Sequence, residues 1–186
     1  ATDGADGNPG TAAAPLASLQ AAADRASPGD EIRVRPGVYH QWLHGTRAGT
    51  AAARIRVVAD GAGVVLDGSD PALLHASGWT SVGGGVYSIP FGGTTRLVCA
   101  DSLQRLYHHA SLADLAAGAN GVPQGWTVAD GRLYVRLEDG SSPAGHTLHV
   151  ARYDIGVFLE ASHWRIGGLE VRHFGTTAAA AGINLR

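Results

Sequence analysis

The sequence contains no lysine, so all fourteen of its basic residues are arginines. This absence excludes any mechanism that takes a lysine base, a Schiff base or a P-loop lysine from this chain. The single cysteine, Cys99, excludes an internal disulfide framework and a cysteine-based zinc cluster. Charged residues make up only 16% of the chain and the net charge is −2, which excludes a basic nucleic-acid surface.

Long apolar runs are also missing, and no stretch approaches the length that a membrane-spanning helix needs. Hydrophobic residues nevertheless reach 45%, which is enough for a packed core in one domain, or in one domain with an insertion. Glycine is abundant, at 27 of 186 residues, and this indicates many turns between short strands. The opening Ala1–Gly4 has the character of a mature end left after signal-peptide cleavage.

The hydrophobic period changes early in the chain. Apolar residues recur at every third and fourth position over 15–26, which predicts one short helix with Ser18 as a candidate N-cap. From residue 31 onward the period is two, as in Glu31–Tyr39 and Arg54–Asp60, which predicts strands. Val34 and Val57 occupy matching positions in these two segments, so we expect them to lie opposite each other.

A second repeat lies near the end of the chain. Gly156–Glu160 and Gly182–Arg186 match position by position, so that Val157 aligns with Ile183 and Leu159 with Leu185. Short strands that recur at intervals of about 23–26 residues, without a leucine-rich signature or a blade-length period, favour an all-β solenoid. The predicted fold is a right-handed parallel β-helix with an N-terminal capping helix and a small α/β insertion.

Residues 72–145 interrupt this repeat. They contain a short helix capped by Ser111 and two alternating strands joined by Asp130-Gly131, a strong hairpin signal. We therefore expect a cap and first coils over 1–71, an insertion over 72–145, and further coils over 146–186. The strand 147–152 is expected to rejoin the stack.

Several motifs resemble those of a known protein type. The motifs lie at Asn8–Thr11, Leu19–Ala23, Pro28–Asp30, Arg35–Tyr39, and Ser77–Tyr87 followed by Gly131–Arg136. Together they resemble secreted bacterial β-helix proteins, many of which are polysaccharide lyases or glycoside hydrolases. The resemblance implies a secreted or cell-surface protein whose partner is a polysaccharide rather than nucleic acid or a membrane. The residues themselves leave open an adhesive β-helix that stacks with other chains and a non-catalytic glycan-binding module.

The last strand pattern ends at Arg186, which predicts an open coil edge at the C-terminus. Three explanations remain open at this point. The chain is the N-terminal part of a longer enzyme, another chain or copy covers the edge, or no cap is needed.

Candidate catalytic residues lie in the later repeat. His163, Arg165, Arg172 and His173 suit proton abstraction next to a carboxylate that arginine neutralises, although a polar outward face explains them more simply. Glu160 is a candidate acid or base, with Glu170 or Asp154 as the second carboxylate that glycoside hydrolysis needs. Glu160 opposite Arg186 is first of all a cross-strand ion pair.

Candidate ligand-binding residues are Phe158, Asn184 and Arg186, which share an outward face, together with Trp164. Exposed tryptophan can stack on sugar rings, and Trp42 is a further example, whereas Trp79 and Trp126 suit the core of the insertion. A basic stripe of Arg33, Arg35, Arg54 and Arg56 either faces an acidic glycan or pairs with acidic neighbours.

A calcium site is the cofactor hypothesis, with Asp60, Asp67 and Asp70 as its ligands, because calcium prefers six to eight oxygens. The alternative is turn capping in a glycine-rich bend. Asp3, Asp6 and Asn8 also have an oxygen-ligand spacing but better fit turn capping. His108 and His109 are adjacent and so point to opposite faces of a strand, which argues against a shared metal.

Overall fold

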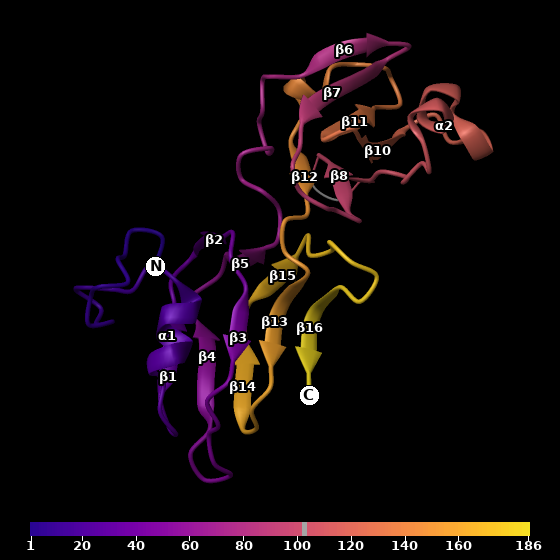
Figure 1. The fold of residues 1–186 in the computed structure, drawn as a ribbon. Helices are drawn as coiled ribbons and strands as arrows, with labels where there is room; N and C mark the ends of the chain where they lie inside the picture. The colour runs from indigo at the N-terminus through magenta and orange to yellow at the C-terminus, as the bar shows by residue number, and fades with distance from the viewer. Residues whose placement is uncertain (102–103) are drawn as a thin grey trace. The chain divides into compact units, whose positions relative to one another are not determined.

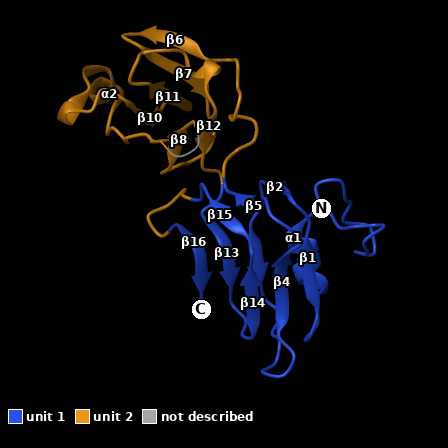
Figure 2. Ribbon diagram, turned by 180° about the vertical axis from the view of Figure 1, so that it is seen from behind, with its two compact units in different colours: residues 1–68, 153–174, 180–186 blue, residues 69–152, 175–179 orange. Residues whose placement is uncertain are grey.

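The computed structural model describes residues 1–101 and 104–186 (Figure 1). The chain forms two compact units (Figure 2). Unit 1 comprises residues 1–68, 153–174 and 180–186, and unit 2 comprises residues 69–152 and 175–179. Among the described residues, no helix has the length and apolar character needed to cross a membrane.

Unit 1 contains three parallel sheets of three strands each. The chain passes through the three sheets in turn, so each sheet takes one strand from each of three passes. The first sheet orders β1 (Glu31–Val34), β4 (Ile55–Ala59) and β14 (Trp164–Gly167). The second orders β2 (Gly37–Tyr39), β5 (Val64–Asp67) and β15 (Glu170–Arg172). The third orders β3 (Leu43–Gly45), β13 (Ile155–Leu159) and β16 (Ala181–Leu185).

Unit 2 is built from antiparallel sheets. One sheet has the order β10-β11-β7-β6, formed by Gly125–Ala129, Arg132–Arg136, Val86–Pro90 and Thr80–Gly83. The other has the order β12-β8-β9, formed by Leu148–Val150, Val98–Ala100 and Gln104–Arg105. Helix α2 (Leu112–Ala117) and two 3₁₀ turns, Ala119–Gly121 and Pro143–Gly145, complete the unit.

The prediction of a right-handed parallel β-helix is wrong. The chain is all-β with several small sheets, some parallel and some antiparallel, and its α-helices in the described ranges are two short ones. Residues 69–152 interrupt the parallel sheets, because they form a separate antiparallel unit with its own apolar core. The repeat on which the prediction rested is therefore local to unit 1 and is not a continuous property of the chain.

Some of the finer expectations are confirmed. Val157 pairs with Ile183 and Leu159 with Leu185 in the parallel ladder of β13 and β16. The Asp130-Gly131 hairpin is present between β10 and β11, and both turn residues have the positive φ of a tight two-residue turn.

Two register expectations are wrong. Val57 lies opposite Ile32, and Val34 lies opposite Ala59, so the expected pairing of Val34 with Val57 is displaced along the strand. The strand at 147–152 does not rejoin the parallel ladders, because β12 pairs antiparallel with β8 in unit 2. Alternating residues predicted a strand there correctly, but alternation does not determine the partner strand or its direction.

Helix α1 (Leu19–Arg25) closes the side of unit 1 next to β3. The predicted N-cap is confirmed, since the Ser18 hydroxyl accepts the Ala21 backbone N–H at 3.1 Å. The Gln20 side chain donates to the His44 carbonyl at 3.1 Å and accepts the His44 N–H at 2.8 Å. The helix thereby supplies hydrogen bonds to the exposed edge of β3, which would otherwise offer unpaired backbone groups.

The N-terminal loop is fastened to α1 by Asp6. Its carboxylate accepts hydrogen bonds from the Ser18 N–H at 2.8 Å, the Ser18 hydroxyl at 2.8 Å and the Ala17 N–H at 3.0 Å. The bonds from Ser18, aided by Ala17 and the charge of Arg25, hold the pKa of Asp6 below its usual value despite slight desolvation. The Asp6 carboxylate thus accepts these hydrogen bonds in its ionised form.

We expect this carboxylate to make unit 1 less stable in acid. Because the folded-state pKa of Asp6 is depressed, its contribution is present above the unfolded pKa and disappears as the pH falls through the folded pKa. The Asp6→Asn variant should therefore be less stable than the parent at pH 6 and differ less from it at pH 3. Urea unfolding followed by circular dichroism at both pH values measures this. An equal difference at both would contradict the assignment.

Candidate functional site: the outward face of β3, β13 and β16

The outward face of the third sheet carries a row of side chains from its three strands. His44 on β3 lies opposite Phe158 on β13, which lies opposite Asn184 on β16. The neighbouring positions Leu43, Val157 and Leu159 turn inward and are buried in the core of unit 1. Period-two alternation thus separates an apolar inner face from an outer face bearing rings and polar groups.

Aromatic rings and a guanidinium form a continuous stack on this face. The rings of Trp42 and His44 are stacked with centroids 5.5 Å apart, and those of His44 and Phe158 with centroids 5.0 Å apart. The Arg186 guanidinium lies 5.1 Å from the centroid of the Phe158 ring. Trp42 ends this stack and is 40% exposed, so that one face of its indole is turned away from His44.

A carboxylate lies beside the stack. The Glu160 Oε2 atom is 3.0 Å from His44 Nε2, so the imidazole donates from Nε2 to the carboxylate. Both side chains remain accessible, at 27% for His44 and 43% for Glu160. The ladder extends beyond the strands, because the Glu160 N–H donates to the Gly45 carbonyl and the Arg186 N–H donates to the Leu159 carbonyl, each at 3.0 Å. Backbone hydrogen bonds therefore position the polar end of this face.

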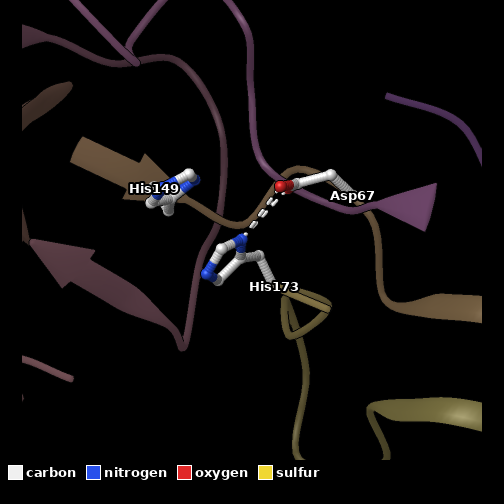
Figure 3. A group of neighbouring side chains, drawn as sticks. All are labelled: Asp67, His149 and His173. Carbon is white, nitrogen blue, oxygen red and sulfur yellow. Dashed lines mark hydrogen bonds and ion pairs between the residues drawn. The ribbon is translucent and has the colours of Figure 1, made fainter. Parts of the chain in front are cut away.

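A second group of ionisable residues lies at the end of the second sheet of unit 1, which contains β2, β5 and β15. Arg172 on β15 pairs in register with Asp67 on β5, and the Arg172 Nε–H donates to Asp67 Oδ2 at 3.0 Å. His173 Nδ1 is 3.0 Å from the same oxygen and 3.2 Å from Oδ1 (Figure 3). The Asp67 side chain is 1% exposed and that of His173 is 4% exposed.

The charge of Asp67 is thus shared between an arginine and a histidine in a buried place. Burial works against the charged form of Arg172, but hydrogen bonds and charges from Asp67 and Glu170 outweigh it and raise the pKa of the guanidinium. Glu170 Oε1 accepts from Arg172 Nη1 at 2.9 Å on the exposed side. Because Asp67 is buried and already bonded, we interpret the group as a clamp between β5 and β15.

The predicted catalytic residues lie on different sheets of unit 1 and do not form one group. Glu160 lies on the outward face of β13, whereas Arg172, His173 and Glu170 surround Asp67. His163 is exposed in a left-handed turn before β14, and Arg165 is exposed on β14 opposite Arg56. The two histidine–arginine pairs therefore lie on different sheets. Asp154 precedes β13, and its backbone carbonyl accepts the Ala181 N–H.

The predicted ligand-binding residues are mostly brought together. Phe158, Asn184 and Arg186 share one face, as expected from the repeat. Trp164 does not join them, because it packs against the core of unit 1 and donates its indole N–H to the Arg47 carbonyl at 2.7 Å. Sequence reasoning missed His44; its alternation with inward Leu43 was the available signal.

The predicted calcium ligands have separate partners. Asp60 is exposed and pairs with Arg33 at 3.3 Å, and Asp67 is occupied as described above. Asp70 belongs to unit 2, where it accepts the Ala72 N–H at 3.0 Å, as a turn-capping residue does. Asp6 accepts from Ser18, Asn8 donates to the Pro15 carbonyl, and Asp3 pairs with Arg35, so these three side chains contact residues well beyond their own turn.

Other singled-out residues have structural partners. Arg33 and Arg56 both pair with Glu31. Arg35 pairs with Asp3 at 3.7 Å and donates to the Ala12 carbonyl. Arg54 is exposed. In unit 2, His109 is buried and His108 is exposed, as expected for adjacent residues with opposite orientation. Trp126 and Cys99 are buried in unit 2, and Trp79 packs partly buried against its core.

Comparisons with known proteins give a likeness of fold. No family model matches the chain, and no curated protein matches its sequence. A structure described as XylC in complex with xylose matches with a TM-score of 0.79 and 19% identity, covering 97% of this chain. A structure described as a glycoside hydrolase matches with a TM-score of 0.59 and 10% identity, covering 94%. At these identities the likeness concerns the fold alone.

The chain is shorter than both of these similar structures. It spans 35% of the length of the XylC chain and 50% of that of the glycoside hydrolase. The activity of a longer protein does not transfer to a segment that matches only part of it. The function of this chain must be argued from its own residues.

Proposed function

We propose that this chain is part of a carbohydrate-active protein and that the outward face of β3, β13 and β16 binds a saccharide. The observation that carries the proposal is the stack of Trp42, His44 and Phe158 with Arg186 at its end. The fold likeness to a xylose complex and to a glycoside hydrolase supports the same class of ligand.

Trp42 is the expected platform for a sugar ring. Both faces of the Phe158 ring have neighbours, His44 and Arg186, whereas the indole of Trp42 stacks on one side only among the described ring contacts. A pyranose presents an apolar C–H face that packs on a flat aromatic surface, and an indole offers the largest such surface. The exposed end of the stack therefore supplies the apolar half of a saccharide site.

The polar half of the site comes from the same face. Glu160 offers carboxylate oxygens, Asn184 an amide that both donates and accepts, and Arg186 a guanidinium, all groups that bond sugar hydroxyls. A few polar groups next to an apolar surface orient a bound ligand. Glu160 is the carboxylate that contacts the ring stack among the described residues, and we assign it ligand binding.

Replacing Trp42 with alanine should weaken saccharide binding about tenfold, which corresponds to ~1.4 kcal/mol. The loss reflects the removed stacking surface, while the buried neighbour Leu43 and its strand remain. Isothermal titration of the full chain with xylose, xylotetraose and a trigalacturonate measures the affinities. The neutral and acidic ligands together identify the class of sugar that the Glu160–Arg186 end accepts.

The matched control is Tyr107→Ala, which removes a similarly exposed aromatic ring from unit 2. This variant should bind saccharide like the parent chain. Absence of binding to all three ligands would overturn the proposed function. Binding that persists unchanged in Trp42→Ala would move the site away from this face.

A further inference from the structure

Unit 2 contains a second group of reactive side chains, which the proposed saccharide site does not use. Ser141 Oγ is 2.9 Å from His146 Nε2, and His146 Nδ1 is 2.6 Å from Asp101 Oδ2. The three residues come from separate segments: Asp101 follows β8, Ser141 follows β11, and His146 follows the 3₁₀ turn Pro143–Gly145. Each nitrogen of the imidazole thus has its own partner.

We propose that Ser141, His146 and Asp101 form a hydrolytic triad that cleaves acyl esters. The chemistry of acyl transfer needs a hydroxyl nucleophile within reach of a base, and a third group that orients the base. Here the carboxylate accepts from Nδ1–H, so that in the neutral imidazole Nε2 is the acceptor that faces the serine hydroxyl.

Asp101 is held in the orientation that this role requires. Its Oδ1 atom accepts the Thr147 N–H at 3.0 Å, which turns Oδ2 toward His146. Its backbone adopts a left-handed conformation with φ of 44°, an uncommon state for a residue other than glycine and one that clusters at functional sites. Hydrogen bonds from His146 and Thr147 hold the pKa of Asp101 below its usual value, so it stays ionised at neutral pH.

A cavity of about 300 Å³ adjoins the histidine and its carboxylate. His146 and Asp101 line it, together with Gln104, Gln124 and the acidic residues Glu138 and Asp139. Gln104 Nε2 donates to Gln124 Oε1 at 2.9 Å, which leaves the Gln124 amide nitrogen as a donor. Amide donors of this kind can stabilise the oxyanion that forms during acyl transfer.

The proposed reaction balances with water as the only co-reactant. Ser141 Oγ attacks the ester carbonyl carbon while His146 Nε2 takes its proton, and the imidazolium then gives that proton to the departing alcohol oxygen. Water attacks the resulting acyl-serine while His146 takes one of its protons. The imidazolium then gives this proton to the departing Ser141 Oγ, which restores the serine hydroxyl and releases the carboxylic acid.

Asp139 sets the resting position of the serine proton. The Ser141 hydroxyl also lies 2.7 Å from Asp139 Oδ1, to which it donates in the resting arrangement. A hydroxyl has one proton, so this bond and the bond to His146 Nε2 alternate. In the proposed cycle the proton passes from the first bond to the second before attack.

The test uses the full chain and a fluorophosphonate probe, which reacts with activated serine hydroxyls. Cleavage after Arg136 and Arg152 gives a peptide that contains both Ser141 and Ser142, and fragmentation of that peptide by mass spectrometry locates the label. We expect the label on Ser141 in the parent chain and its loss in both Ser141→Ala and His146→Ala. Hydrolysis of p-nitrophenyl acetate should fall at least 100-fold in Ser141→Ala.

Ser142→Ala is the control, because its hydroxyl contacts the Ala144 N–H and not the histidine. It should retain labelling and hydrolysis, and circular dichroism checks that each variant folds. A parent chain without label on Ser141, or equal hydrolysis by Ser141→Ala, would overturn the triad and leave these bonds as turn contacts. The two sites share no residue, so failure of saccharide binding leaves this result independent.

Discussion

Replacing Asp67 with alanine should lower the free energy of unfolding by about 3–5 kcal/mol, the usual cost of breaking a buried ion pair on one side. The carboxylate is almost fully buried and accepts from Arg172 Nε and His173 Nδ1. Its removal takes away the acceptor that the Arg172 charge and the His173 N–H share. Urea unfolding followed by circular dichroism measures the change.

Two further variants distinguish the effect of losing the buried Asp67 carboxylate from the effect of losing an exposed charge. Asp67→Asn keeps the volume and one acceptor oxygen, so its loss of stability should be smaller than that of Asp67→Ala. Glu170→Gln weakens an exposed bond to the same arginine and should cost no more than about 1 kcal/mol. If Asp67→Ala cost as little as Glu170→Gln, the clamp between β5 and β15 would not be a stabilising feature.

The local elements of this fold follow from the sequence because their causes are local. Ser18 and Ser111 cap the two helices, since a serine before an apolar helical pattern offers its oxygen to the first free N–H groups. The pairs Val157–Ile183 and Leu159–Leu185 follow instead from the position-by-position match of Gly156–Glu160 with Gly182–Arg186. The caps thus depend on residues close together in the chain, and these pairs depend on a short sequence repeat.

The register error at Val34 has a physical cause. Moving a parallel strand by two positions keeps every inward side chain inward, so the expected and the observed registers satisfy the same hydrophobic pattern. The choice between them depends on how the turn after β1 is built and on what packs against Ile32 and Val57. Alternation alone cannot distinguish the two registers.

The overall architecture and the candidate site depend on contacts between distant parts of the chain. His44 and Glu160 are 116 residues apart, and Asp67 and His173 are 106 apart, because unit 2 lies between them in sequence. Spacing therefore could not predict either contact. The same intervening unit is why a repeat seen at both ends of the chain did not imply one continuous parallel structure.

Replacing Leu43 with alanine should lower the free energy of unfolding by about 2–5 kcal/mol, the range for large-to-small changes at well-packed sites. Leu43 is fully buried in the core of unit 1, between the outward residues Trp42 and His44. Its side chain anchors β3 at the point where the ring stack begins. Urea unfolding of the purified variant measures the loss.

The same change should also weaken saccharide binding, because a loosened β3 no longer holds Trp42 and His44 in one stack. Val38→Ala is the matched control: Val38 is an exposed apolar residue on β2, and truncating it creates no cavity. It should change stability by less than about 0.5 kcal/mol and leave binding intact. A Leu43→Ala variant that is destabilised yet binds xylotetraose like the parent would show that the ring stack forms independently of the core beneath it.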